Sequence, residues 1–344
     1  MTQYSFVDIL DHHDESTDGC SDSWPSSVLP SDRDRQAILA LSLVASGSPA
    51  TVRHLLRHYA PQDVLQSAAD ILASGDLDNH SRSVLEKIRA APPDMLLSEA
   101  EKQSTLAHRL GAIVLTYQDH TYPANLQEAL ESPLILFVRG TLDEERDPLS
   151  VALVGTREAS GEGLARARKI ARLFVERGIV VVSGLARGID TAAHLATLDA
   201  GGRTLAVVGC GLDRTYPSEN VALADAIADG GAVVSQFPFG SPPTQAHFPM
   251  RNKTMALLSR ATIVVEAGLT SGAKMQANYA LRVKMPKRHV FLMDSLINGQ
   301  NEHEWAHEFL GRGAQRLRDI GDVMQILPGH QHTAPSDGQM PLFL

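Results

Sequence analysis

The segment HEWAH at residues 303–307 places two histidines and a glutamate in the H-E-x-x-H spacing of zinc peptidases. His303 and His307 share one face of the exposed helix that the pattern predicts over residues 302–311, so a zinc site is geometrically possible there. Peptidase chemistry also needs a third protein ligand and a cleft that holds the substrate, and the surrounding sequence offers no such context. We therefore expect no peptidase activity, and we assign no metal, no cofactor and no catalytic residue to the chain.

Other candidates for covalent chemistry are few. Ser183 lacks the G-x-S-x-G elbow of hydrolases, and Cys210, between two glycines, is typical of a packed strand end. Asp190 and His194 lie four residues apart on an expected helix, where a local hydrogen bond that steadies the helix start is favoured over acid–base catalysis. The sequence thus gives little support to an enzyme.

A different chemistry recurs in four loops, each of which follows a short apolar run. The loops read TREAS after SVALVG, GLARGIDTAAH after IVVVS, CGLDRTYPSEN after TLAVVG and GLTSGAKMQA after TIVVEA. Glycines let backbone N–H groups approach an anion, the following helix adds its positive end, and Arg157, Arg187 and Arg214 supply charge that suits phosphate oxygens. No loop completes G-x-G-x-x-G and no G-x-x-x-x-G-K-[ST] exists, so dinucleotide binding and Walker-type ATP hydrolysis are disfavoured.

A second basic group lies in FPMRNKTMALLS at residues 248–259. There Arg251, Asn252 and Lys253 begin an expected helix directly after Phe248 and two further residues. An aromatic ring beside cations is typical of a site that stacks a base while it holds the sugar–phosphate backbone. Together with the four loops, this segment predicts binding to several phosphates or to a chain of them.

The loops require a sheet that brings them to one edge. Apolar runs rich in Val, Ile and Leu predict buried strands at residues 112–117, 134–138, 150–155, 179–183, 204–209, 232–236, 262–267 and 289–293. Helical patterns such as GLARARKIARLFVERG separate most of the later runs. This alternation predicts an α/β fold, an extended Rossmann-like, doubly wound and mainly parallel sheet, in which ligands bind at the carboxyl ends of the strands.

Composition divides the chain into four parts. Residues 1–32 form an acidic tail with seven Asp or Glu and no Lys or Arg, residues 33–100 a small helical domain, 105–328 the Rossmann domain and 329–344 a flexible tail. His12 and His13 lie between acids in the tail. A solvated acidic tail explains this stretch as well as a loosely bound metal ion would. The turn at Gly47 is read as an ordinary helical corner, because a DNA-binding helix-hairpin-helix would need a glycine pair.

The formal charge of −9 excludes a protein that coats nucleic acid by bulk positive charge, so binding would need a local basic cleft. No run of about 18 apolar residues offers a membrane span, and the first residues lack the basic and apolar parts of a signal peptide. The sequence therefore predicts a cytoplasmic protein without a membrane partner.

The run VALVGTREAS, then VVSGLARGIDTAAHLATLDAGGRTLAVVGCGLDRTYPSEN, then FPMRNK and VVEAGLTSGA resembles the DNA processing protein A (DprA/Smf) family from about residue 117 to 327. The resemblance implies a Rossmann domain that binds single-stranded DNA without sequence preference, forms a homodimer and assists loading of a RecA-type recombinase. It also implies which residues contact nucleic acid: Gly155, Thr156, Arg157, Ser183, Gly184, Arg187, Gly209, Gly211, Phe248, Arg251, Asn252, Lys253, Ser271 and Gly272.

The chain departs from the family's pattern near its end. The family reads close to RSGSLITA followed by a VPG turn, whereas this chain has TSGAKMQANYALRVKMPKRHVFLMDSL, and no winged helix follows residue 327. Members of the family also occur as partners of toxins in phage defence, so an antitoxin or sensor with a cognate toxin stays open. A nucleotide-hydrolysing Rossmann enzyme is a further alternative, disfavoured because EAGLTSGAKMQA lacks the Glu of the P-G-G-x-G-T-x-x-E element.

Overall fold

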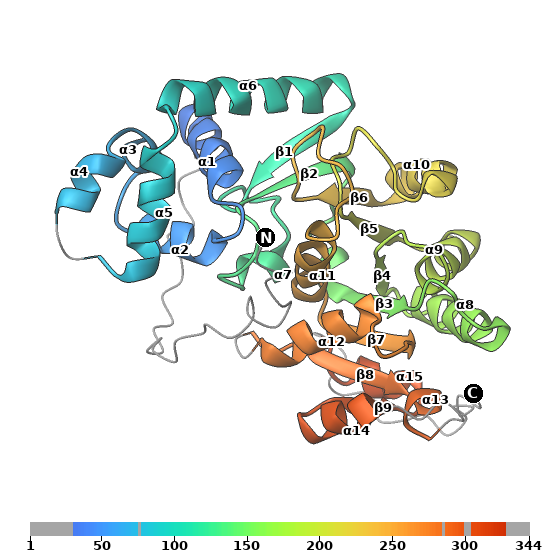
Figure 1. Cartoon of the computed structure of the whole chain (residues 1–344). Coiled ribbons are helices and arrows are strands. Elements are labelled where there is room, and N and C mark those ends of the chain that lie inside the picture. Colours follow the sequence, from blue (N-terminus) through green and yellow to red (C-terminus); the bar gives the residue numbers. More distant parts are fainter. Residues whose placement is uncertain (1–29, 75–76, 284–285, 299–303, 328–344) are drawn as a thin grey trace, which may run out of the picture.

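The computed structural model describes residues 30–74, 77–283, 286–298 and 304–327 (Figure 1). Within these residues, nine strands form one sheet in the order β1-β2-β6-β5-β4-β3-β7-β8-β9. β1 and β2 are antiparallel to their neighbours, and the strands from β6 to β9 are parallel. The strands are β1 (Ala112–Thr116), β2 (Ile135–Gly140), β3 (Ser150–Gly155), β4 (Val180–Ser183), β5 (Thr204–Val208), β6 (Ala232–Ser235), β7 (Ala261–Glu266), β8 (His289–Met293) and β9 (Gln315–Leu317).

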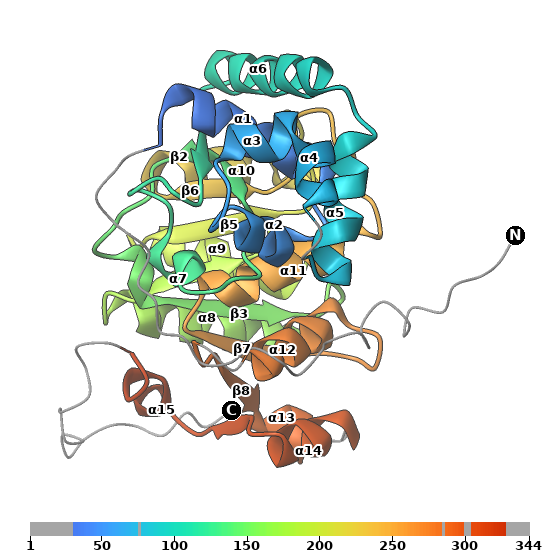
Figure 2. The ribbon, with the colours of Figure 1, turned by 90° about the vertical axis from the view of Figure 1, so that its left-hand side faces the viewer.

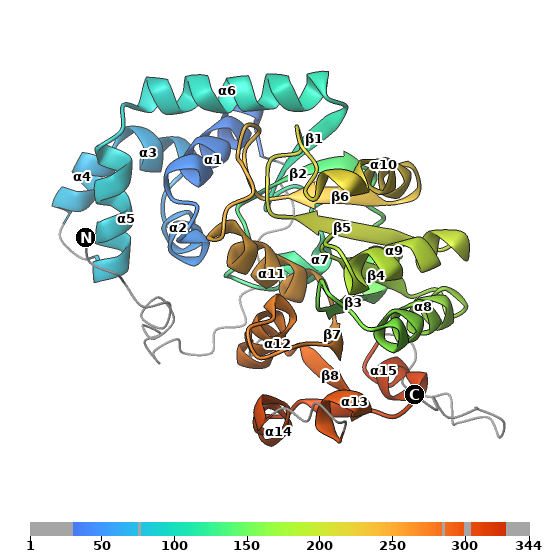
Figure 3. The same cartoon turned by 45° about the vertical axis from the view of Figure 1, so that its right-hand side comes forward.

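Helices cover both faces of the sheet (Figure 3). On one face lie α8 (Gly161–Val175), α9 (Ile189–Asp199) and α10 (Val221–Gly230); on the other lie α11 (His247–Leu258) and α12 (Gly272–Arg282). Short elements join them: α7 (Ala124–Gln127), η1 (Asp147–Leu149), η2 (Ser218–Asn220), α13 (Asp294–Ile297), α14 (Glu304–Gly311) and α15 (Ile320–Met324).

Alternate residues of a central strand enter two separate cores. Leu205 and Val207 of β5 pack with α11, whereas Ala206 and Val208 pack with Leu223 and the rest of α10. Because successive side chains of a strand point to opposite faces, a strand covered by helices on both sides must be apolar throughout. This is why these strands read as continuous apolar runs in the sequence.

The amino-terminal helices lie at the β1 edge of the sheet, where α1 contacts β1 and β2 and α6 contacts β1 (Figure 2). They are α1 (Asp32–Val44), α2 (Pro49–Leu55), α3 (Pro61–Gln66), α4 (Ala68–Ala73), α5 (Asn79–Arg89) and α6 (Pro93–Arg109). An ion pair of 2.6 Å joins Arg35 to Asp119, and the Gln103 side chain accepts a 2.8 Å hydrogen bond from the Phe239 N–H. The helical region and the sheet therefore share one apolar core.

All eight predicted strands are present, and the mainly parallel doubly wound fold is confirmed. The helical domain predicted over residues 33–100 includes α5 and most of α6, and α6 runs without a break through residues 100–105. The predicted exposed helix at 302–311 begins at Glu304 in the described part and buries Trp305, Ala306 and Phe309, so its predicted exposure is wrong. The tails 1–29 and 328–344 lie outside the described residues, and with them His12 and His13.

No helix in the described ranges is both long enough and apolar enough to cross a membrane.

Candidate nucleic-acid interface

A small hollow lies where β3, β4 and β5 end and α11 begins, and it encloses roughly 40 Å³. Its walls are the loops that the sequence singled out, because parallel strands bring their carboxyl ends to the same edge of the sheet. The lining residues are Arg157, Gly184, Ala186, Arg187, Gly209, Cys210, Tyr216, Pro217, Pro243, Phe248 and Arg251. Three arginines and two aromatic rings thus meet around one cavity.

Arg251 forms the floor of this hollow. Its side chain is buried, with the residue only 6% exposed, and its Nη1 donates hydrogen bonds to the carbonyl oxygens of Gly184 (2.6 Å) and Val207 (3.0 Å). Gly184 is required by this approach, since a Cβ there would overlap the Arg251 guanidinium. The guanidinium is held rigidly, which lowers the entropy lost when it binds an anion.

Two aromatic rings form one wall. The Phe248 ring has the Arg157 guanidinium 5.2 Å from its centroid, and the Tyr216 ring lies 5.9 Å away at 41°. Gly209 leaves room for Phe248, because a Cβ there would lie 3.1 Å from the ring. Tyr216 is 44% exposed, so its ring offers a surface on which a base can stack.

Several backbone donors of the loops are already occupied by the protein's own carboxylates. Glu266 accepts from the Ser160 N–H (3.1 Å) and from its hydroxyl (2.7 Å), at the amino end of α8. Asp190 accepts from the N–H groups of Gly184 (3.1 Å) and Ala186 (3.4 Å). The expectation that the loop N–H groups cradle phosphate therefore fails at these two places, and the arginine side chains are left as the principal anion-binding groups.

Burial shifts the pKa values of the ionisable side chains beneath the hollow. It raises the pKa of Asp190, although the positive Arg251 opposes this, and it lowers the pKa of Arg251. Burial also lowers the pKa of His194 to about 3, assisted by Arg251, so this imidazole is neutral. His194 Nδ1 lies 2.7 Å from the Thr204 hydroxyl, and Asp190 and His194 are not hydrogen-bonded to each other.

Arg187 lines the hollow but already has a carboxylate partner. Its Nε and Nη2 donate to the two Glu219 oxygens at 2.7 and 2.6 Å, and this contact raises the pKa of Arg187 and lowers that of Glu219. Arg214 pairs with the adjacent Asp213 at 3.0 Å and does not line the cavity. A phosphate must therefore compete with Glu219 for Arg187.

Six of the fourteen residues predicted to contact nucleic acid line the hollow, and eight lie around it in other contacts. Ser183 is buried and donates to the Leu153 carbonyl, Asn252 donates to the Gly272 carbonyl, and Lys253 pairs with Glu131. Ser271 caps α12 through the Ala273 N–H. Three predicted residues remain outside the hollow. Gly155 packs closely against Ile189, and the N–H groups of Thr156 and Gly211 donate to the carbonyls of Glu266 and Ser241.

The residues that sequence reasoning did not select are Tyr216, Pro217, Pro243, Ala186 and Cys210. Tyr216 had a signal in GLDRTYP, an aromatic residue in a loop that also carries Arg. Burial raises the pKa of Cys210 to about 11, so this residue is a packed thiol and not a nucleophile at neutral pH.

The described residues of the HEWAH segment do not line the hollow. His303 lies outside the described residues, and the His307 Nε2 is 3.2 Å from the Ile297 carbonyl oxygen. In the part of the chain that is described, no three His, Cys, Asp or Glu side chains gather as metal ligands would.

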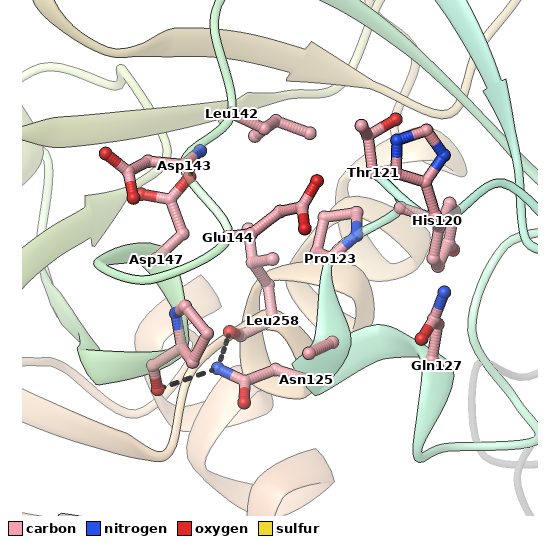
Figure 4. Close-up of a pocket in the computed structure, with 13 residues that line it drawn as sticks. His120, Thr121, Pro123, Asn125, Gln127, Leu142, Asp143, Glu144, Asp147 and Leu258 are labelled. Carbon is pink, nitrogen blue, oxygen red and sulfur yellow. Dashed lines mark hydrogen bonds between the residues drawn. The ribbon is translucent and has the colours of Figure 1, made fainter.

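A larger hollow of about 160 Å³ lies beside α7 and η1 (Figure 4). Asn125 spans its base by donating to the carbonyls of Leu258 (2.8 Å) and Pro148 (3.3 Å), shown as dashed lines. Asp143, Glu144 and Asp147 line it, and such carboxylates repel phosphate. The cavity for an anion is therefore the smaller, arginine-lined one.

The fold and this cavity define a class: doubly wound, Rossmann-like proteins whose strand-end loops form a cationic and aromatic cavity. The chain belongs to the DNA recombination-mediator protein A family, whose model matches residues 113–328, and it is a DNA-processing protein. The sequence resemblance to this family is thereby confirmed.

Curated relatives agree. The protein Smf of Synechocystis sp. is 34% identical over 314 residues, covering 85% of this chain and 76% of that protein. The DNA processing protein DprA of Streptococcus pneumoniae is 39% identical over 207 residues, covering 60% of this chain and 71% of that protein.

Solved structures agree as well. The structure of DprA from Streptococcus pneumoniae matches with a TM-score of 0.66 and 30% identity, over 85% of this chain and 98% of that one. A structure of DNA processing protein A from Helicobacter pylori, described by its single-stranded DNA binding mode, matches with a TM-score of 0.53 and 27% identity, over 62% of this chain and 93% of that one. Neither an antitoxin nor a nucleotide-hydrolysing enzyme is favoured by these relatives.

Proposed function

We propose that this protein binds single-stranded DNA without sequence preference, as a non-catalytic mediator of DNA recombination. The observation that carries the proposal is the meeting of Arg157, Arg187 and Arg251 with Phe248 and Tyr216 around one cavity. Arginines hold phosphates, and aromatic faces stack any base, so the combination is tolerant of sequence. The Helicobacter pylori relative, named for its single-stranded DNA binding mode, supports it.

Single strands are favoured over duplexes by the exposed Tyr216 ring at the wall of the hollow. The arginines beside it can hold a phosphate while the ring stacks on an unpaired base. In a duplex the base faces are already stacked, so Tyr216 would contribute nothing to duplex binding.

We further propose the organisation that the family resemblance implies: a helical domain at 33–100 and a Rossmann domain at 105–328, acting in the cytoplasm as a homodimer that delivers DNA to a RecA-type recombinase. The outer site residues, Lys253 and Asn252 among them, are proposed to help position the loops or the strand. The altered segment after residue 267 makes the dimer and the recombinase surface the parts of this proposal that most need testing.

The test is an anisotropy titration of the full chain with labelled single-stranded and double-stranded oligonucleotides at several salt concentrations. We expect tight single-strand binding with a slope of log affinity against log salt of about −0.7 per phosphate, hence roughly −2 for three arginines. Arg157→Ala should weaken binding and flatten the slope, whereas Arg89→Ala, an exposed arginine on α5, should do neither. Absence of single-strand binding, or an unchanged Arg157→Ala variant, would reject the proposal.

A further inference from the structure

The outer face of α8 carries three cations that no neighbouring acid neutralises. Arg168, Lys169 and Arg172, which we call the α8 ridge, are exposed, and no hydrogen bond or ion pair joins their side chains to any residue within the described ranges. With about 3.6 residues per turn, the three lie within roughly 100° of one another around the helix axis. They form one continuous charged strip.

Helix stability explains the α8 ridge only at Arg172, which lies in the last turn, where the helix dipole favours a cation. Arg168 and Arg172 are four residues apart, a spacing at which like charges repel and destabilise the helix. The acids at the two ends of the helix are already paired, Glu162 with Arg166 at 2.9 Å and Glu176 with Arg177 at 3.5 Å. In a chain of net charge −9, an uncompensated strip of three cations indicates an anionic partner.

The α8 ridge is continuous with the hollow. α8 begins at Gly161, four residues after Arg157, and lies on the outer surface beside α9 (Figure 3). The exposed small residues Gly161 and Ala165 lie on the same side of the helix as the cations, as does Glu162, whose carboxylate is engaged by Arg166 at 2.9 Å. At 1.5 Å rise per residue, the cations lie roughly 10 to 17 Å along the helix.

We propose that the α8 ridge is a second contact for the DNA backbone, reached by the strand that leaves the hollow past Arg157. A strand whose bases stay stacked, with one phosphate per about 3.4 Å as in a duplex strand, covers the 10 to 17 Å in about three to five nucleotides. The strip has no aromatic residue, so it contacts phosphates alone and adds affinity only for strands long enough to reach it. This inference rests on the proposed function of the hollow and extends it.

The experiment compares the wild type with the triple variant Arg168→Gln, Lys169→Gln, Arg172→Gln, in which glutamine keeps the helix propensity. Oligothymidylates of about 3 and about 25 nucleotides separate a strand too short to reach from the hollow to the strip from one that reaches both, because the two lie about three to five nucleotides apart. For the long strand we expect affinity at low salt to fall about tenfold and the salt slope to decrease by about 2, that is, 0.7 for each of three phosphates. The short strand should bind both proteins equally.

The matched control removes three exposed cations elsewhere, Lys87, Arg89 and Arg109, by the same substitutions and should leave both strands unaffected. If the ridge variant binds the long strand with the same affinity and the same salt slope as the wild type, the α8 contact is overturned, although the hollow remains a DNA site. The partner of the α8 ridge would then be an acidic protein surface. If the wild type binds neither strand, the proposed function and this extension fall together.

Discussion

The carboxylate of Glu266, at the end of β7, is hydrogen-bonded to both the N–H and the hydroxyl of Ser160, at 3.1 and 2.7 Å. Ser160 is the residue that caps α8, and its hydroxyl accepts from the Gly163 N–H at 3.0 Å. In nucleotide-binding Rossmann folds, the amino end of this first helix receives a phosphate. In this protein the Glu266 carboxylate occupies the amino end of α8, where nucleotide-binding members of the fold bind a phosphate.

The first prediction concerns this contact. Glu266→Gln should lower the free energy of unfolding by about 1 kcal/mol, because a charged acceptor at a helix amino end is replaced by a neutral one. It should also make the protein more stable in added inorganic phosphate, which can then approach α8. Urea unfolding with and without phosphate measures both effects. Glu158→Gln, on the same loop and without a side-chain partner in the described residues, is the control, and an equal phosphate response in both variants would contradict the prediction.

The second prediction concerns the floor of the hollow. Gly184→Ala should abolish single-strand binding and destabilise the fold by about 2 kcal/mol or more, because the added methyl group displaces Arg251 from its carbonyl acceptors. Anisotropy and thermal unfolding check the two parts. Gly47→Ala, where nothing lies within 4 Å of the added methyl group, should change neither. Retention of full DNA affinity by Gly184→Ala would show that Arg251 does not contact the strand.

The third prediction concerns competition for Arg187. Glu219→Gln should raise single-strand affinity several-fold at low salt, because a phosphate no longer displaces a carboxylate from the guanidinium. The gain should shrink as salt rises, since exposed charges are screened. Glu86→Gln, an exposed acid on α5, removes the same charge far from the hollow and should leave affinity unchanged. An equal gain in both variants would indicate net charge and not competition.

The fourth prediction concerns pH. His194 has a folded pKa of about 3, below its unfolded value of about 6.5, so the folded state binds fewer protons in this range. Its contribution to stability is complete above pH 6.5 and is lost as the pH falls towards 3, by up to about 5 kcal/mol at 1.36 kcal/mol per pH unit. His194→Gln should flatten the dependence of unfolding free energy on pH between 6.5 and 4, whereas His108→Gln, at an exposed position, should not. An identical pH dependence in wild type and His194→Gln would refute this assignment.

The sequence by itself determined the sheet and the edge at which function lies. Continuous apolar runs such as SVALVG predict strands buried on both faces, and the loops after them must meet because parallel strands end at one edge. Hence Arg157, Arg187, Phe248 and Arg251 could be selected without coordinates. The helical domain predicted over residues 33–100 contains α5 and most of α6, but the sequence did not reveal that α6 continues to Arg109, where it packs on the distant strand β1.

Only the tertiary structure decided which selected residues face the cavity and which are already engaged. Lys253 and Arg251 are two residues apart on α11, yet one pairs with Glu131 and the other lies beneath Gly184, because a helix turns about 200° over two residues. Likewise, glycine-rich loops predict free N–H groups, but Asp190 of the same loop accepts from the Gly184 N–H, and Glu266, far away in the sequence, accepts from the Ser160 N–H. Local pattern specifies the backbone, and long-range packing selects which donors remain open to a ligand.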